Sequence, residues 1–386
     1  MKDHLTAATG YFEPATCDID AFNALIARET APDMCPRAVD IQSKVPIYDM
    51  AALRPELEDV ASRRALMSEW AQVLLSGPGA VVLKRAYADT SVLDEATEVF
   101  NAIIAEEKAD KGAGADHFAA AGANDRIWNV QEKLCLRAPD LFVRYFANTT
   151  LDAISEAWLG RGYQMTSQVN LVHPGGAAQE AHRDYHLGFM TTEQAAGYPA
   201  HMHMLSPLLT LQGAVAHCDM PVASGPTQLL PYSQAYPAGY VAFRLPAFRD
   251  AFAASAIQLP LDKGDALFFN PALFHAAGEN KTTDIERMAN LFQVSSPMGR
   301  SLEKLDRLAM AKAVYPHLGQ VSGLEQVAAI AAAAEGYPFP TNLDTDPPVG
   351  GLAPESDQAL LIRALASGLL ADEVNAALDA AAAKRG

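Results

Sequence analysis

The chain has 386 residues, and half of them are hydrophobic, which is enough to build a large domain whose core needs no disulfide or metal to hold it. The formal net charge is −17, from 29 basic and 46 acidic residues. This charge argues against a nucleic-acid-binding protein, because phosphate binding needs a basic surface. The sequence has no uninterrupted apolar run of about 18 residues and does not start with a basic segment followed by an apolar one, so we expect a cytoplasmic protein without a membrane span.

The first part of the chain, residues 1–160, is predicted to be mainly helical. Its hydrophobic patterns predict helices over residues 19–28, 56–75, 91–108 and 141–159. One strand is expected at Ala80–Lys84, directly after the helix-ending sequence Ser-Gly-Pro-Gly. A stretch rich in glycine and alanine, residues 111–123, is predicted to be mobile.

The pattern changes at Tyr163, after which short β-like runs alternate with glycine and proline. These runs cover residues 165–173, 204–218, 265–269 and 288–295. Several short strands separated by turns favour a sandwich or barrel over a sheet of βαβ units. A double-sheet jelly roll also brings strands that are distant in sequence together. We therefore predict an α+β fold with a jelly-roll core, a cupin-like double-stranded β-helix, over residues 161–298.

After the predicted core the pattern becomes helical again. The helical segments are residues 302–315, 323–334 and 356–384, which are rich in alanine, a strong helix former. Ser356 is a suitable N-cap for the last of them. Residues 299–386 are thus expected to form a helical extension, which either packs on the core as plain scaffold or provides a surface for a homo-oligomer.

The candidate functional site is centred on His182-Arg183-Asp184. In an extended strand, residues i and i+2 point to the same side, so His182 and Asp184 can converge while Arg183 points away. With the distant His275 they would form a two-histidine, one-carboxylate set, which leaves metal positions open and is typical of non-haem Fe(II) oxygenases. Arg287, twelve residues after His275, offers a fixed fork of donors for a carboxylate such as that of 2-oxoglutarate.

The motifs around these residues make the constellation specific. They are His-Pro-Gly-Gly at residues 173–176, Ser-Gly-Pro-Thr at 224–227 and Lys-Gly-Asp-Ala-Leu-Phe-Phe at 263–269. In their order and spacing, over about residues 163–297, the chain resembles the phytanoyl-CoA dioxygenase family of Fe(II)/2-oxoglutarate-dependent oxygenases. The resemblance implies that His182, Asp184 and His275 bind the iron. It also implies that Arg287 pairs with the C5 carboxylate of 2-oxoglutarate.

The resemblance also implies roles for residues around the metal. Asn170 matches a position that often contacts the cosubstrate, and Gln168, on the same face of the strand, could face either cosubstrate or substrate. Thr227 is expected to help orient the groups that hold the cosubstrate. Trp128 and Phe189 could line the substrate pocket, although aromatic residues in such positions more often belong to the core.

One position departs from the family pattern. Many members carry a serine or threonine two residues after the distal histidine, where the hydroxyl helps to hold 2-oxoglutarate. This chain has Ala277 there. Either another hydroxyl makes that hydrogen bond, or the cosubstrate is held more weakly. The departure concerns the affinity for the cosubstrate and not the metal.

The implied activity is hydroxylation of an unactivated C–H bond in a small-molecule metabolite by a single catalytic domain, residues 1–386. It would consume O2 and 2-oxoglutarate and release succinate and CO2. Asp184 favours hydroxylation over halogenation, since related halogenases lack this carboxylate. Desaturation, demethylation and epimerisation stay open. Two other functions also stay open: a metal-dependent hydrolase or isomerase on a cupin-like fold, and a non-catalytic ligand-binding member.

Other histidines lie near the motif in sequence. We predict that His173, His186 and His217 pack in the structure or support the metal ligands. His201 and His203 alternate as in a strand, which would place both imidazoles on one face. No third ligand is apparent for them, so we expect no second metal site there.

Overall fold

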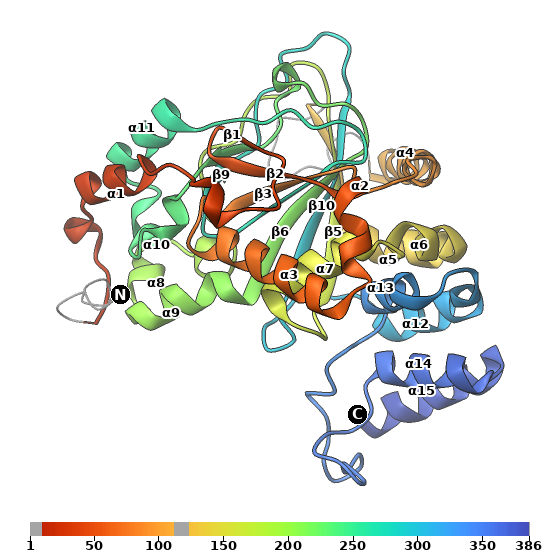
Figure 1. Ribbon diagram of the computed structural model, residues 1–386. Helices are drawn as coiled ribbons and strands as arrows, with labels where there is room; N and C mark the ends of the chain where they lie inside the picture. Colours follow the sequence, from red (N-terminus) through yellow and green to blue (C-terminus); the bar gives the residue numbers. More distant parts are fainter. Residues whose placement is uncertain (1–9, 112–122, 386) are drawn as a thin grey trace.

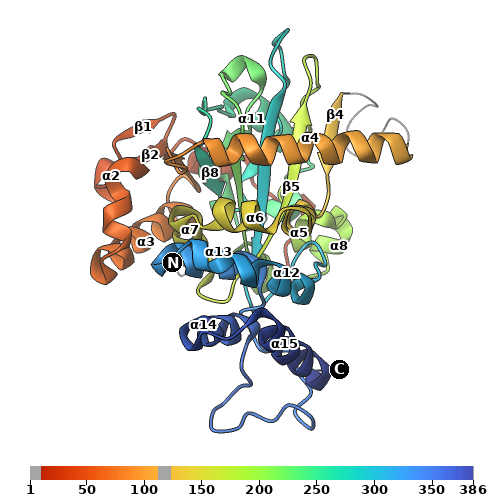
Figure 2. The ribbon, with the colours of Figure 1, turned by 90° about the vertical axis from the view of Figure 1, so that its right-hand side faces the viewer.

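The computed structural model describes residues 10–111 and 123–385, and its centre is one large, mainly antiparallel sheet (Figures 1 and 2). The strands are β1 (Asp40–Gln42), β2 (Val45–Asp49), β3 (Ala80–Lys84), β4 (Asn124–Ile127), β5 (Gln164–Val172), β6 (Thr210–Ala216), β7 (Gln228–Leu230), β8 (Ala266–Phe269), β9 (Phe274–Ala276) and β10 (Arg287–Ser295). Eight of them form the large sheet in the order β1-β2-β3-β8-β6-β10-β5-β4, and β7 pairs with β9 in a second sheet.

Helices surround the large sheet. They are α1 (Ile19–Ile26), α2 (Met50–Leu53), α3 (Val60–Leu75), α4 (Ser91–Lys111), α5 (Val130–Arg137), α6 (Pro139–Phe146), α7 (Thr149–Leu159), α8 (Thr192–Ala196), α9 (Ala200–Leu205), α10 (Gly239–Ala242), α11 (Pro246–Ser255), α12 (Arg307–Val314), α13 (Gly323–Ala333), α14 (Asp357–Ser367) and α15 (Ala371–Arg385). The predicted helices near the N-terminus are confirmed as α1, α3 and α4. The stretch predicted to be mobile, residues 111–123, lies almost entirely outside the described residues.

Strand residues alternate between the two faces of the large sheet, and this alternation separates two cores. On β6, Leu211 and Val215 belong to the larger core under the helices, whereas Ala214 and Ala216 face the second sheet. Helices α5, α6, α7 and α13 cover the first face (Figure 2). The small alanines leave room on the other face, where a cavity lies. The predicted α+β fold with a double-stranded β-helix core is confirmed.

Five of the ten strands in the described structure were predicted from the sequence. The patterns at β3, β5, β6, β8 and β10 predicted strands, and the structure confirms them. The sequence analysis missed β1, β2, β4, β7 and β9. The prediction was wrong for the first part of the run at residues 204–218, because Ser206–Leu209 is a 3₁₀ turn that follows α9. Pro207 in this turn has no N–H to give to a sheet.

Two segments predicted as single helices are divided in the structure. Residues 141–159 form α6 and α7, because the side chain of Asn148 accepts hydrogen bonds from backbone N–H groups and starts a new helix. Residues 356–384 form α14 and α15, because Gly368 ends α14 in the left-handed region, with φ at +65°. Ser356 caps α14 as predicted.

The C-terminal helices form two layers beside the core. α12 and α13 pack against α5 and α6, and α14 and α15 lie on the far side of α12 and α13 (Figures 1 and 2). A homo-oligomer formed through this surface stays a prediction. Among the described residues, none of the helices combines the length and the apolar character that a bilayer span requires.

Candidate metal and cosubstrate site

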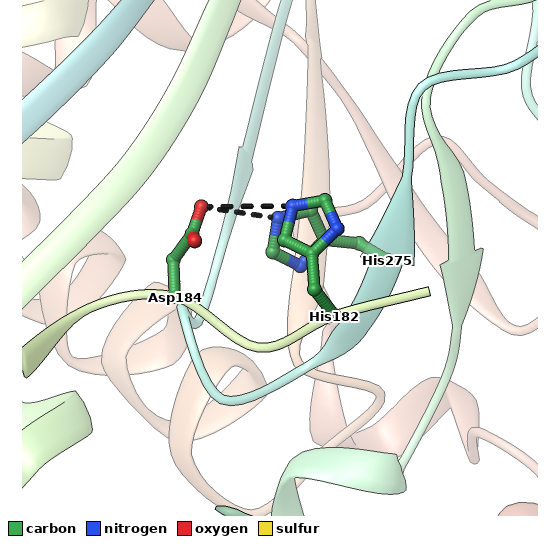
Figure 3. A group of neighbouring side chains, drawn as sticks. All are labelled: His182, Asp184 and His275. Carbon is green, nitrogen blue, oxygen red and sulfur yellow. Dashed lines mark ion pairs between the residues drawn. The ribbon is translucent and has the colours of Figure 1, made fainter. Parts of the chain in front are cut away.

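His182, Asp184 and His275 lie together at one wall of the cavity (Figure 3). Each offers one potential metal ligand atom, and these atoms all lie within 4.8 Å of one another. Nε2 of His275 is 3.5 Å and Nε2 of His182 is 3.9 Å from Oδ2 of Asp184. No other group of three such residues is found in the described part of the chain.

Backbone hydrogen bonds bring the two histidines together. The N–H of His182 donates to the carbonyl of His275 (2.9 Å), and the N–H of His275 donates to the carbonyl of His182 (3.1 Å), so the two residues form an isolated antiparallel bridge. Arg183 points to the opposite side, as predicted, and is 2% exposed. Its Nη2 donates to the carbonyl oxygens of Ser233 and Tyr236. The motif does not lie in a strand, and the bridge at His182 is its only sheet pairing in the described structure.

The two imidazoles are held in the tautomer that a metal requires. Nδ1 of His182 contacts the carbonyl of Glu180 at 2.8 Å, and Nδ1 of His275 contacts the carbonyl of Leu273 at 2.8 Å. A carbonyl can only accept, so both Nδ1 atoms carry a proton, and Nε2 is the ring atom that each histidine offers to a metal. Burial lowers the pKa of His182, which favours the neutral ligand form.

Asp184 supplies the negative charge of the set. Burial alone would raise the pKa of Asp184, but the imidazoles of His275 and His182 and the amide of Gln212 favour the charged form and lower the pKa to about 2. The carboxylate is therefore ionised at neutral pH. Two imidazoles that present Nε2 and one carboxylate that converge on one point fit Fe(II) with open positions.

Arg287 is a buried cation in the same cavity. It is 6% exposed, and its Nη1 donates weak hydrogen bonds to the carbonyls of Ser224 (3.3 Å) and Gly278 (3.4 Å). Burial lowers the pKa of Arg287 to about 10, which still leaves it charged at neutral pH. Among the described residues no carboxylate forms an ion pair with it. A buried guanidinium without a counter-charge fits an anionic ligand such as the carboxylate of 2-oxoglutarate.

The Ser-Gly-Pro-Thr turn, residues 224–227, lies beside Arg287 and has a structural role. Gly225 has φ at +74°, and a Cβ on it would lie 2.3 Å from the carbonyl oxygen of Glu279. Only glycine fits this position. The tight turn brings the carbonyl of Ser224 to Arg287 and places Thr227 on the cavity wall.

The cavity has a volume of about 830 Å³, and all nine predicted site residues line it. They are Trp128, Gln168, Asn170, His182, Asp184, Phe189, Thr227, His275 and Arg287. Asn170 and Gln168 lie on β5, opposite Ala289 and Leu291 of β10. Phe189 is 59% exposed and Trp128 is half-buried. The structure thus places these side chains together, and their individual roles stay predictions.

Several polar residues of the site were missed at the sequence level. Arg126 donates to Oε1 of Gln168 at 3.2 Å, and Nε2 of Gln168 contacts Oε1 of Gln293 at 3.2 Å. Oε1 of Glu303 accepts from the N–H of Asn129 at 2.8 Å. One sequence feature could have indicated such residues: a polar side chain within an otherwise apolar strand, as at Gln293.

The other histidines have structural partners. His173 contacts Asp125 and Glu286, and His186 contacts Thr210. The strand-like interpretation of His201 and His203 was wrong, because both lie on α9, where residues i and i+2 do not share a face.

His217 is buried between two hydroxyl groups and is the basis for a stability prediction. Thr97 Oγ1 lies 2.9 Å from its Nδ1, and the Tyr145 hydroxyl lies 2.9 Å from its Nε2. Burial, aided by the charge of Lys263, lowers the pKa of His217 to about 3. An unfolded histidine binds a proton below a pH of about 6.5, so folding is disfavoured as the pH falls from about 6.5 toward 3.

We expect the wild-type apo-protein to lose about 2 kcal/mol more unfolding free energy than His217→Gln between about pH 7 and pH 5. Urea unfolding of both proteins at the two pH values measures this difference. The comparison isolates His217 from the other titrating groups, since these are common to both proteins. Equal pH dependence in the two proteins would contradict the buried, neutral state of the imidazole.

The chain is similar to known proteins over more than half of its length. The family model described as phytanoyl-CoA dioxygenase (PhyH) matches residues 60–289, more than half of the chain. The dioxygenase trt7 of Aspergillus terreus (strain NIH 2624 / FGSC A1156) is 25% identical over 218 residues, which are 55% of this chain and 68% of that protein.

Two solved structures show a weaker overall similarity. The non-haem α-ketoglutarate-dependent epimerase SnoN from nogalamycin biosynthesis has a TM-score of 0.41 at 18% identity, over 62% of this chain and 84% of that one. HygX from Streptomyces hygroscopicus, solved with nickel and 2-oxoglutarate bound, has a TM-score of 0.41 at 14% identity, over 61% of this chain and 90% of that one.

The extent of the family match decides the class of the protein. It spans β3 to β9 and the first three residues of β10, and it includes His182, Asp184 and His275. The predicted enzyme class and cofactors, iron, 2-oxoglutarate and O2, are confirmed. The chain belongs to the phytanoyl-CoA dioxygenase family and is a non-haem iron, 2-oxoglutarate-dependent dioxygenase.

Proposed function

We propose that the enzyme hydroxylates an unactivated C–H bond of a small-molecule metabolite and releases succinate and CO2. The observation that carries the proposal is the joint presence, in one cavity, of the His182, Asp184 and His275 set and the uncompensated cation of Arg287. When bound, iron with 2-oxoglutarate and O2 supplies the oxidation, in which one oxygen atom enters the substrate and the other enters succinate.

Different residues of the chain bind the metal and the cosubstrate. The two histidines and Asp184 hold the metal on one side and leave the other side open to the cavity. Arg287 pairs with the C5 carboxylate of 2-oxoglutarate, and Asn170 contacts the cosubstrate. The hydroxyl of Thr227, on the same cavity wall, takes the place of the hydroxyl that is absent at Ala277.

The residues that line the cavity indicate the class of substrate that fits it. A volume of about 830 Å³ lies within the usual range of small-molecule pockets and has room for a metabolite beside the cosubstrate. Arg126, Gln168 and Gln293 make one part of the wall polar, while Phe189 and Leu302 are apolar and partly exposed. A metabolite with a polar and an apolar part, oriented by Trp128 and Phe189, fits this division.

The proposal is tested first by anaerobic titration of the apo-protein with Fe(II) and 2-oxoglutarate. A visible metal-to-ligand charge-transfer band, followed by succinate formation when O2 is admitted, is the expected result. Metabolites are then screened for faster succinate formation, and incorporation of ¹⁸O from ¹⁸O2 into the product distinguishes hydroxylation from desaturation or epimerisation. Iron binding without the band would favour the ligand-binding alternative, and hydrolysis supported by zinc would favour the hydrolase.

A further inference from the structure

Gln212 makes a contact in the site that none of these roles explains. It faces the cavity from β6, is 6% exposed, and its Nε2 donates a hydrogen bond of 2.6 Å to Oδ2 of Asp184. The same oxygen is the one nearest to Nε2 of His275 (3.5 Å) and to Nε2 of His182 (3.9 Å). The amide therefore acts on the carboxylate oxygen that is turned toward the two imidazoles.

The position of Gln212 is fixed by the middle of the sheet. β6 lies between β8 and β10, and Gln212 pairs with Phe269 on one side and Gln293 on the other. The next residue, Gly213, packs against the ring of Phe268, since a Cβ on it would lie 2.4 Å from that ring. β6 is thus held by the strands on both of its sides and by Phe268 on the face that points away from the cavity.

Asp184, by contrast, lies outside the strands. Its N–H donates to the carbonyl of Pro271 at 3.0 Å, and its own carbonyl accepts from the hydroxyl of Tyr240 at 3.1 Å. These bonds hold the backbone but leave the carboxylate free to rotate about its last torsion. In the described structure, Gln212 is the one amide side chain that hydrogen-bonds this carboxylate. The rigid strand thus supplies the constraint that the segment of Asp184 lacks.

We infer that Gln212 is a positioning residue of the metal site, which holds Oδ2 of Asp184 toward the two imidazoles before the metal arrives. The inference rests on the metal ligands proposed above. A carboxylate that is already oriented loses less conformational freedom when it binds the metal. Gln212 also turns its amide N–H, and not its carbonyl, to the carboxylate, because two facing oxygens would repel each other.

The test is a titration of wild-type apo-protein and Gln212→Leu with Co(II), an air-stable substitute for Fe(II) with visible d–d bands. Gln212→Leu is expected to bind Co(II) about 10–100-fold more weakly. Its d–d bands should also differ from those of the wild type, because the freed carboxylate can bind through both oxygens. Gln131→Leu removes another buried glutamine, one that bonds Ala332 and Ser167 away from the cavity, and should leave the affinity and the bands unchanged.

The outcomes separate this inference from the proposed function. If the wild type binds one Co(II) per chain and Gln212→Leu has the same affinity and spectrum, the positioning role of Gln212 is wrong. The assignment of His182, Asp184 and His275 as metal ligands is then unaffected. If the wild type binds no metal, the metal set fails and the inference with it. Gln212→Asn, whose shorter side chain keeps the amide but cannot span the same distance, should behave like Gln212→Leu. Thermal unfolding of each apo-variant checks that it is folded.

Discussion

Replacement of Asp184 by asparagine is expected to remove metal binding and, with it, all succinate formation. The carboxylate is the only negative charge of the three-residue set, and its pKa of about 2 keeps it ionised at neutral pH. Loss of a contact to a metal ligand already costs about 10–100-fold in metal affinity, so loss of the charged ligand itself should cost more than about 100-fold. Metal content after Fe(II) loading and gel filtration measures the effect.

The matched control is Glu180→Gln. Glu180 also lines the cavity, two residues before His182, but its carboxylate pairs with Arg249 at 2.9 Å instead of with the imidazoles. Its backbone carbonyl, which accepts from Nδ1 of His182, is unchanged by the substitution. Metal content should therefore match the wild type. A similar loss of metal in both variants would mean that the acidic side chains of the cavity attract the metal together. The assignment of His182, Asp184 and His275 as its ligands would then be wrong.

The residues of the candidate metal site could be identified from the sequence because their signals are local or ordered. His182 and Asp184 are two residues apart, and an extended backbone is enough to bring them to one side. His275 and Arg287 were assigned from their order and spacing within the resemblance, and the structure places both at the same cavity. The longer strands were predictable for a similar reason, since alternation over many residues is a strong signal.

The supporting residues could not be predicted, because their contacts depend on how strands align. Gln212 meets Asp184 only when β6 stands between β8 and β10 in one register, and a single sequence does not contain that register. Gln168 likewise contacts Arg126 and Gln293 across two different strand pairs. The divided helices have another cause, because Gly368 or a capping Asn148 within a good helical pattern is weak evidence against continuation.

Replacement of Arg287 by methionine is expected to weaken 2-oxoglutarate binding strongly while it stabilises the apo-protein. Loss of a buried charged partner costs about 2–5 kcal/mol, which corresponds to a factor of about 30 to several thousand in Kd. The apo-protein should gain about 1 kcal/mol in unfolding free energy, because it no longer buries a guanidinium without a counter-charge. Arg287→Lys keeps the charge but not the two-pronged geometry, and should lie between the two proteins in affinity.

The role of the distal carboxylate can be isolated with 2-oxobutyrate, which has the 2-oxo acid group of 2-oxoglutarate but no C5 carboxylate. Wild-type protein loaded with Fe(II) should prefer 2-oxoglutarate in anaerobic titrations of the charge-transfer band, and Arg287→Met should not distinguish the two acids. A preference retained by the variant would place the C5 carboxylate elsewhere in the cavity, with Arg126 the next cation to test. A less stable apo-variant would show that the weak bonds to Ser224 and Gly278 outweigh the cost of burying the charge. The enzyme thus keeps a cation that its fold alone would not favour, and 2-oxoglutarate is the ligand that would compensate it.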